Sequence, residues 1–171
     1  MSHKSACFFV ALACATTLAA QDNPISADTK GFYTSVKNNI IKSADKMSEA
    51  NFSFKPTPDV RTFAQVLGHI ADGQYLFCGP VRGEEKKSEV EKGPQTKAAI
   101  VEALKAAFAY CDAAYDKLTD ATAAEKVKFF GRDRTKVGVL SINSGHNNEH
   151  YGNLVTYMRL KGIVPPSSEG R

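Results

Sequence analysis

The sequence lacks several patterns that would point to other classes of protein. Beyond the N-terminal segment, no stretch is apolar enough to span a membrane. The formal net charge is only +4, and the basic residues form no stripe interleaved with aromatic residues, so we expect no nucleic-acid partner. No strand-like alternation of any length is present. Histidine is also scarce, with four in 171 residues, which makes the position of each one informative.

The N-terminal segment is predicted to be a secretory signal peptide. A short polar start containing Lys4 precedes an apolar run at 6–15, and small residues follow up to Ala19 and Ala20. The apolar run is too short to span a bilayer. Cleavage near Ala20 would remove residues 1–20 and export the chain to the periplasm or the medium. The stretch ending at Cys14 also resembles a lipoprotein signal, but alanine stands where leucine is usual, which favours the ordinary signal peptide.

The predicted mature chain, residues 21–171, has the size of one domain. Removing 20 of 171 residues leaves 151, and the net charge falls from +4 to +3 because Lys4 is the only charged residue removed. A chain of this length can bury a real core. Its two cysteines, Cys78 and Cys111, could form a disulfide after export. They could equally be small buried apolar residues, and the position of Cys111 on an apolar helix face favours that alternative.

Apolar residues recur at intervals of three and four in four segments of about 20 residues. These predicted helices cover residues 28–50, 59–78, 95–119 and 134–161. Asp28 or Thr29 is the expected cap of the first helix, Gly79 and Pro80 are expected to end the second, and Gly162 is expected to end the fourth. Four amphipathic helices without strands predict an all-α fold, a four-helix bundle.

Glycines inside two of the predicted helices point to close contacts. A glycine in a helix interior costs about 1 kcal/mol relative to alanine. Gly68 and Gly73 in the second helix, and Gly145 and Gly152 in the fourth, are therefore expected where another helix or a ligand approaches. Between the third and fourth helices, residues 127–131 allow a short extended piece.

Three histidines lie in the predicted mature chain: His69, His146 and His150. In a helix, His146 and His150 share a face and can chelate one ion. They lie on a stripe that is otherwise apolar, formed by Val139, Ile142, Leu154 and Tyr157. With His69 from the second helix they would form an open site for Zn²⁺ or a similar divalent ion. The alternative is two hydrogen-bonded core histidines and an unrelated His69.

The stretch from His146 to His150 also fits the H-x-x-E-H pattern of inverted zinc peptidases, in which the glutamate is the general base. The pattern is short, and those peptidases are much larger proteins with a further carboxylate ligand. Here only Glu169, in the tail, lies more than a few residues downstream. Since adjacent helical residues point about 100° apart, Glu149 is expected on the surface or in a contact between helices.

Two stretches of the sequence resemble the DinB/YfiT-like superfamily of metal-binding four-helix bundles. They are Val66–Asp72 and Asn143–Arg159, the second running into Gly162-Ile163-Val164-Pro165-Pro166. The resemblance implies that one histidine of the second helix and a pair of the last helix bind a divalent metal, Zn or Ni, which carries over to His69, His146 and His150. It also implies that the chain could pair as a homodimer.

The same superfamily includes transferases that use bacillithiol or mycothiol, among them a maleylpyruvate isomerase, and proteins described as metal-dependent hydrolases. The resemblance therefore leaves the reaction open. The predicted signal peptide is a departure from the thiol-dependent members, because those thiols are cytosolic. Export consequently puts a thiol-transferase role in doubt.

Two functions follow from these residues. The first is an exported metal-dependent hydrolase or transferase that acts on a small-molecule substrate through metal-bound water or a polarised carbonyl. Asp72, three residues after His69, would then be a base or a hydrogen-bonding partner of a ligand. Asn143 and Asn153 could orient an imidazole or a substrate, and Tyr157 could line the pocket. The second is a non-catalytic metal-binding or interaction module in which the ion is structural.

Overall fold

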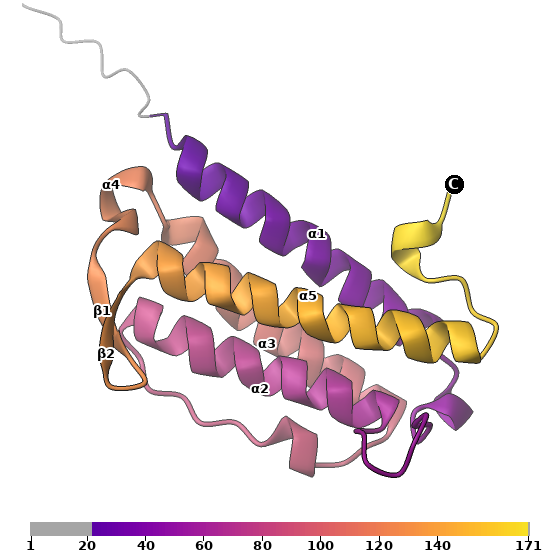
Figure 1. The fold of residues 1–171 in the computed structure, drawn as a ribbon. Helices are drawn as coiled ribbons and strands as arrows, with labels where there is room; N and C mark the ends of the chain where they lie inside the picture. The colour runs from indigo at the N-terminus through magenta and orange to yellow at the C-terminus, as the bar shows by residue number, and fades with distance from the viewer. Residues whose placement is uncertain (1–21, 171) are drawn as a thin grey trace, which may run out of the picture.

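The computed structural model describes residues 22–170, and four long helices account for most of them (Figure 1). They are α1 (Pro24–Lys46), α2 (Phe63–Arg82), α3 (Lys97–Lys117) and α5 (Lys136–Leu160). The connections contain η1 (Glu49–Asn51), η2 (Val90–Lys92), α4 (Asp120–Ala123), β1 (Lys126–Phe129), β2 (Arg132–Thr135) and η3 (Pro166–Ser168). The predicted all-α fold is confirmed.

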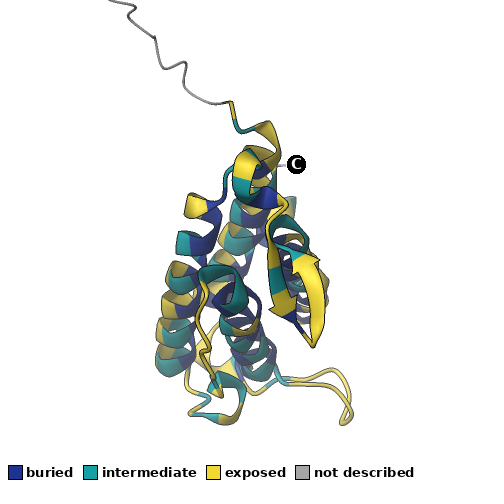
Figure 2. Ribbon diagram, turned by 90° about the vertical axis from the view of Figure 1, so that its left-hand side faces the viewer, coloured by how far each residue is buried: buried dark blue, intermediate teal, exposed yellow. Residues whose placement is uncertain are grey.

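The long helices pack in the cyclic order α1, α3, α2, α5, so that each contacts two neighbours across the core. Figure 2 shows their buried residues facing the interior and their exposed residues facing outward. Each long helix contributes side chains with no exposed surface, such as Ile40, Leu67, Leu104 and Leu140. Burying one such side chain stabilises the fold by about 1.5–3 kcal/mol, so the bundle rests on its apolar core.

The predicted signal peptide, residues 1–20, and with it the lipoprotein alternative at Cys14, lies outside the described residues. Export therefore stays a prediction. Within residues 22–170, no helix is long and apolar enough to cross a membrane.

The first helix begins earlier than predicted because its cap comes from a distant part of the chain. Pro24 occupies the first turn, where its missing N–H is tolerated. The Asp120 carboxylate accepts hydrogen bonds from the backbone N–H groups of Ile25 and Ser26, at 3.1 and 2.8 Å. The predicted caps, Asp28 and Thr29, lie inside the helix instead. Because Asp120 is 94 residues from Ser26, the sequence around the start of the helix gives no sign of this cap.

The prediction that the second helix ends at Gly79 and Pro80 is wrong, because the helix continues to Arg82. Thr62 and Gln65 form a capping box at its start. Its end is set by Gly83, whose φ of 73° lies in the left-handed region that favours glycine. The N–H of Glu84 donates to the carbonyl of Gly79 at 2.9 Å and completes the terminus.

The predicted extended piece between the third and fourth helices is the first strand of a short antiparallel hairpin. β1 pairs with β2, and the turn contains Phe130 and Gly131, both with positive φ. Phe129 is buried against Phe77 of α2 and Val139 of α5, which fixes the hairpin to the end of the bundle. The second strand carries no apolar alternation and could not be recognised in the sequence.

Cys78 of α2 and Cys111 of α3 are joined by a disulfide, and both residues are fully buried. The two alternatives left open by the sequence are therefore combined, since the cysteines lie in the core and are also paired. Their Cα atoms are 5.3 Å apart, within the usual range for a disulfide. The bond links two adjacent helices across the bundle.

Loss of this disulfide should lower the free energy of unfolding by about 3–4 kcal/mol, because it closes a loop between residues 33 positions apart. Urea unfolding of the oxidised mature chain, the reduced chain and the Cys78→Ala/Cys111→Ala variant measures the effect. The two forms without the disulfide should agree with each other. Two free thiols titrating in the denatured, unreduced protein would contradict the prediction.

Candidate metal centre

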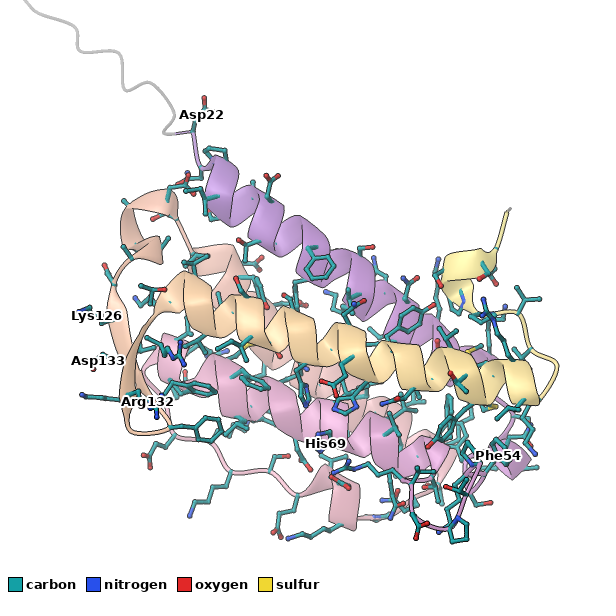
Figure 3. All side chains as sticks on the ribbon, viewed as in Figure 1. Asp22, Phe54, His69, Lys126, Arg132 and Asp133 are labelled. Carbon is teal, nitrogen blue, oxygen red and sulfur yellow. A yellow bond between two sulfur atoms is a disulfide. The ribbon has the colours of Figure 1, made fainter. Side chains whose placement is uncertain are left out.

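The packing of α2 against α5 brings His69, His146 and His150 together, which is the first of the two alternatives left open by their sequence positions. The centroids of the three rings are 4.5–5.0 Å apart. One nitrogen of each ring can be chosen so that all three lie within 4.8 Å of one another, an arrangement that could hold a metal ion. Figure 3 labels His69 on α2, next to the ribbon of α5.

The closest pair of nitrogens has a separation that suits one shared ion. The Nε2 atoms of His69 and His146 are 3.1 Å apart. Two nitrogens bound to one tetrahedral Zn²⁺ at about 2.0–2.1 Å would be roughly 3.3 Å apart. The donor set and its spacing therefore fit a divalent ion.

The other ring nitrogens differ in their partners. Nδ1 of His69 lies 3.0 Å from Oε2 of Glu91, so an Nδ1–H donated to this carboxylate leaves the lone pair on Nε2, where a metal would bind. Nδ1 of His150 lies 3.2 Å from the side-chain amide of Asn153, which is one of the two asparagines expected to orient an imidazole. Nδ1 of His146 is buried and has no hydrogen-bond partner among residues 22–170.

Burial keeps two of the imidazoles neutral. Desolvation, followed by the nearby histidines His150 and His69, lowers the pKa of His146 to about 4. Desolvation, followed by His69 and the positive charge of Arg61, lowers the pKa of His150 to about 4. A neutral imidazole has a lone pair free for a metal ion, so both side chains are in the metal-binding form at neutral pH.

Asp72 acts on the site through the backbone of η2. Its carboxylate accepts hydrogen bonds from the N–H groups of Val90 and Glu91, at 2.8 and 3.0 Å. Gly68 allows the same segment to approach, since a Cβ at this position would lie 2.7 Å from the Cα of Glu91. Asp72 therefore positions Glu91, which in turn contacts His69.

Glu91 is the residue of the site that sequence reasoning missed. It lies in a charged connection without periodicity, 22 residues after His69, so neither spacing nor residue type distinguished it. Its second oxygen, Oε1, accepts a hydrogen bond from Nε of Arg61 at 2.7 Å. The backbone carbonyl of Arg61 accepts in turn from the hydroxyl of Tyr157, also at 2.7 Å. Glu91 thus links the guanidinium of Arg61 to His69, one of the candidate metal ligands.

The glycines near the histidines divide into two groups. At Gly73, a Cβ would lie 2.8 Å from Cε1 of His146, so the expected close approach is present and no larger residue fits without a shift. At Gly145 and Gly152 nothing lies within 4 Å of an added Cβ, and the predicted contacts there are wrong. These two glycines point toward solvent.

Three other residues of α5 show which positions of the helix face inward. Glu149 is exposed, as helix geometry predicted. Ile142 is 39% exposed and does not belong to the inward stripe. Asn143 is fully buried, but its amide donates to Oε1 of Gln74 and to the hydroxyl of Tyr115, both at 3.2 Å. It belongs to a polar cluster behind the site.

Two pockets border the three imidazoles, one on each side. The first, of about 560 Å³, contains His150 together with Arg61, Asn153 and Tyr157 in its wall, which places Tyr157 where it was expected. The second, of about 390 Å³, contains His69 and His146 and continues along the loop at 86–89. Small molecules can therefore approach the histidines from solvent.

Comparison with known proteins places this chain in a family. Residues 33–154, more than half of the chain, match the DinB superfamily. The uncharacterized protein YjoA of Bacillus subtilis (strain 168) is 23% identical over 138 residues, which is 76% of this chain and 86% of YjoA.

Solved structures show the same fold. A DinB-like protein from Bacillus cereus ATCC 10987 superposes with a TM-score of 0.68 at 22% identity, over 80% of this chain and 95% of the other. YjoA from Bacillus subtilis superposes with a TM-score of 0.67 at 22% identity, over 87% of this chain and 100% of the YjoA chain. A mutant of the mycothiol-dependent maleylpyruvate isomerase superposes with a TM-score of 0.64 at 15% identity, over 75% of this chain and 60% of the isomerase chain. Since the family match spans all or part of each of the four long helices, the chain belongs to the DinB superfamily.

Proposed function

We propose that this chain is an exported enzyme that uses a divalent metal ion held by His69, His146 and His150. The observation that carries the proposal is the convergence of three imidazoles, with nitrogens within 4.8 Å, between two pockets. Imidazole ligands suit Zn²⁺ or Ni²⁺. Bound there, such an ion would polarise a carbonyl or lower the pKa of a bound water, which supports hydrolysis or group transfer on a small molecule.

The chain's own residues prepare the ligands. Glu91 holds His69 in the tautomer whose Nε2 is unprotonated. At His150, an Nδ1–H would need an acceptor, and the amide of Asn153 can supply its oxygen, because the two orientations of an amide have the same shape. Arg61 and Asp72 hold Glu91 from its side chain and from its backbone.

The site favours an enzyme over a module with a structural ion. A structural site is normally closed by a fourth protein ligand, whereas a catalytic site keeps a position for water or substrate. Three residues with side chains that can bind a metal ion are occupied elsewhere. Asp72 binds backbone N–H groups, and Cys78 and Cys111 are bonded to each other.

The disulfide supports export, because disulfides persist in oxidising compartments such as the periplasm and the extracellular medium. Together with the predicted signal peptide, it argues for a substrate outside the cytosol. The isomerase that shares the fold uses mycothiol according to its name. Cytosolic thiols would not be available to an exported chain, so we favour hydrolysis over thiol transfer.

The purified mature protein should contain about one divalent ion per chain. His146→Ala should remove the ion and leave the helical circular dichroism spectrum largely unchanged, because the apolar core holds the bundle. Elemental analysis and circular dichroism measure the two effects. Asn148→Ala, an exposed position on the same helix, is the control and should keep the ion. A wild-type protein that takes up neither Zn²⁺ nor Ni²⁺ would refute the proposed site.

Glu91→Gln should weaken metal binding by about 10–100-fold, because His69 would lose the carboxylate that fixes its tautomer and strengthens it as a ligand. Competition with a chelator of known affinity measures the change. Glu89→Gln, an exposed carboxylate two residues earlier, should bind the ion as the wild type does. Equal losses in both variants would show a general effect of loop charge and would contradict the role of Glu91.

The metal-free protein should lose stability as the pH falls from about 6.5 to about 4. His146 and His150 have a folded-state pKa of about 4, below the ordinary 6.5, so in this range the unfolded chain binds protons that the folded chain does not. After allowance for solvent screening, the two histidines should together lower the free energy of unfolding by roughly 1–2 kcal/mol.

Urea unfolding at pH 7.5 and pH 5 measures this loss. The His146→Gln/His150→Gln variant, which retains the carboxylates that titrate in the same range, should lose less stability than the wild type. The same loss in both proteins would show that other groups cause it.

A further inference from the structure

We infer that the pocket beside His150 is a subsite for a carboxylate group of the substrate, and that Arg61 is its anchor. The inference rests on the proposed function and names the class of substrate, a small carboxylic acid whose reactive group reaches the metal. The pocket has a volume of about 560 Å³, enough for a small organic molecule, and Arg61 and His150 both contribute to its wall.

Arg61 is held by one edge and leaves the other available. Its Nε donates to Oε1 of Glu91 at 2.7 Å, and its side chain is 44% exposed. The structure records no hydrogen bond from either terminal nitrogen, Nη1 or Nη2, to any of residues 22–170. The planar guanidinium matches the two oxygens of a carboxylate and can donate to both at once.

The anchor is also fixed in place, which a binding group requires. The backbone carbonyl of Arg61 accepts from the hydroxyl of Tyr157, a largely buried residue of α5. Glu91, which holds the Arg61 side chain, is itself held by His69 and by the bond from its N–H to Asp72. Arg61 is therefore tied to the same framework as the metal ligands.

The charges around the pocket favour an anion once a divalent ion is bound. Glu91 and Asp59 contribute two negative charges to the wall. Arg61 contributes one positive charge and the ion two. Glu91 is already paired with Arg61 and His69, and Asp59 is exposed to solvent, where its charge is screened. A carboxylate would thus enter a region with an excess of positive charge.

The inference can be tested with probes that bind the metal and carry, or lack, a carboxylate. The probes are the monohydroxamates of succinic, glutaric and adipic acid, each compared with its methyl ester. The mature protein is loaded with Co²⁺, whose visible spectrum reports binding of the hydroxamate. At the best chain length, the acid should bind about tenfold more tightly than the ester, as expected for a half-exposed charge-assisted pair.

Substitutions then locate the anchor. Arg61→Gln should make acid and ester bind equally, and Arg61→Lys should retain part of the preference, because it keeps the charge but not the planar fork. Lys87→Gln, an exposed lysine of the other pocket, should leave the preference unchanged. A preference abolished by Lys87→Gln and kept in Arg61→Gln would overturn the inference.

The two levels of failure are distinguishable. A wild-type protein that takes up no Co²⁺ would refute the proposed metal site itself. A protein that binds Co²⁺ and the hydroxamates, but binds acid and ester equally at all three lengths, would refute only the carboxylate subsite.

Discussion

A Cβ atom at Gly68 would lie 2.7 Å from the Cα of Glu91, and one at Gly73 would lie 2.8 Å from Cε1 of His146. The geometry of the site depends on this close approach to α2 from two sides. Gly68 admits the backbone of η2, which brings the Glu91 carboxylate to His69. Gly73 admits the imidazole of α5, which brings His146 to the same place. Any side chain at either position would have to displace a component of the site.

Behind the imidazoles, a buried polar cluster fixes how α5 is turned relative to α2. Gln74 of α2 donates to Oδ1 of Asn147 at 2.8 Å and accepts from Asn143 at 3.2 Å, and all three side chains are fully buried. Buried amides without partners are costly, so this pairing favours one rotation of α5. Asn143, Asn147 and His150 share a buried face of the helix, and the rotation that pairs the amides also turns the histidines toward His69.

Periodicity within single segments allowed the long helices and the shared face of His146 and His150 to be predicted. It left open whether His69 joins them, and the family resemblance favoured that alternative. The sequence did not reveal Glu91 or Arg61, which reach the site from connections without periodicity. Nor did it show that Asp120 caps α1, since that contact spans more than 90 residues.

The source of the fold's stability bears on the role that an ion bound by the three histidines would have. The core is formed by apolar side chains from all four long helices, and the disulfide joins α2 to α3 independently of the histidines. Both features stabilise the fold without a metal, unlike the situation in small domains whose core is insufficient. The three imidazoles lie instead at the edge of the α2–α5 contact, with a pocket on either side. Maintaining desolvated histidines at such a position lowers stability at acidic pH, so the three imidazoles add a cost that the apolar core and the disulfide do not require.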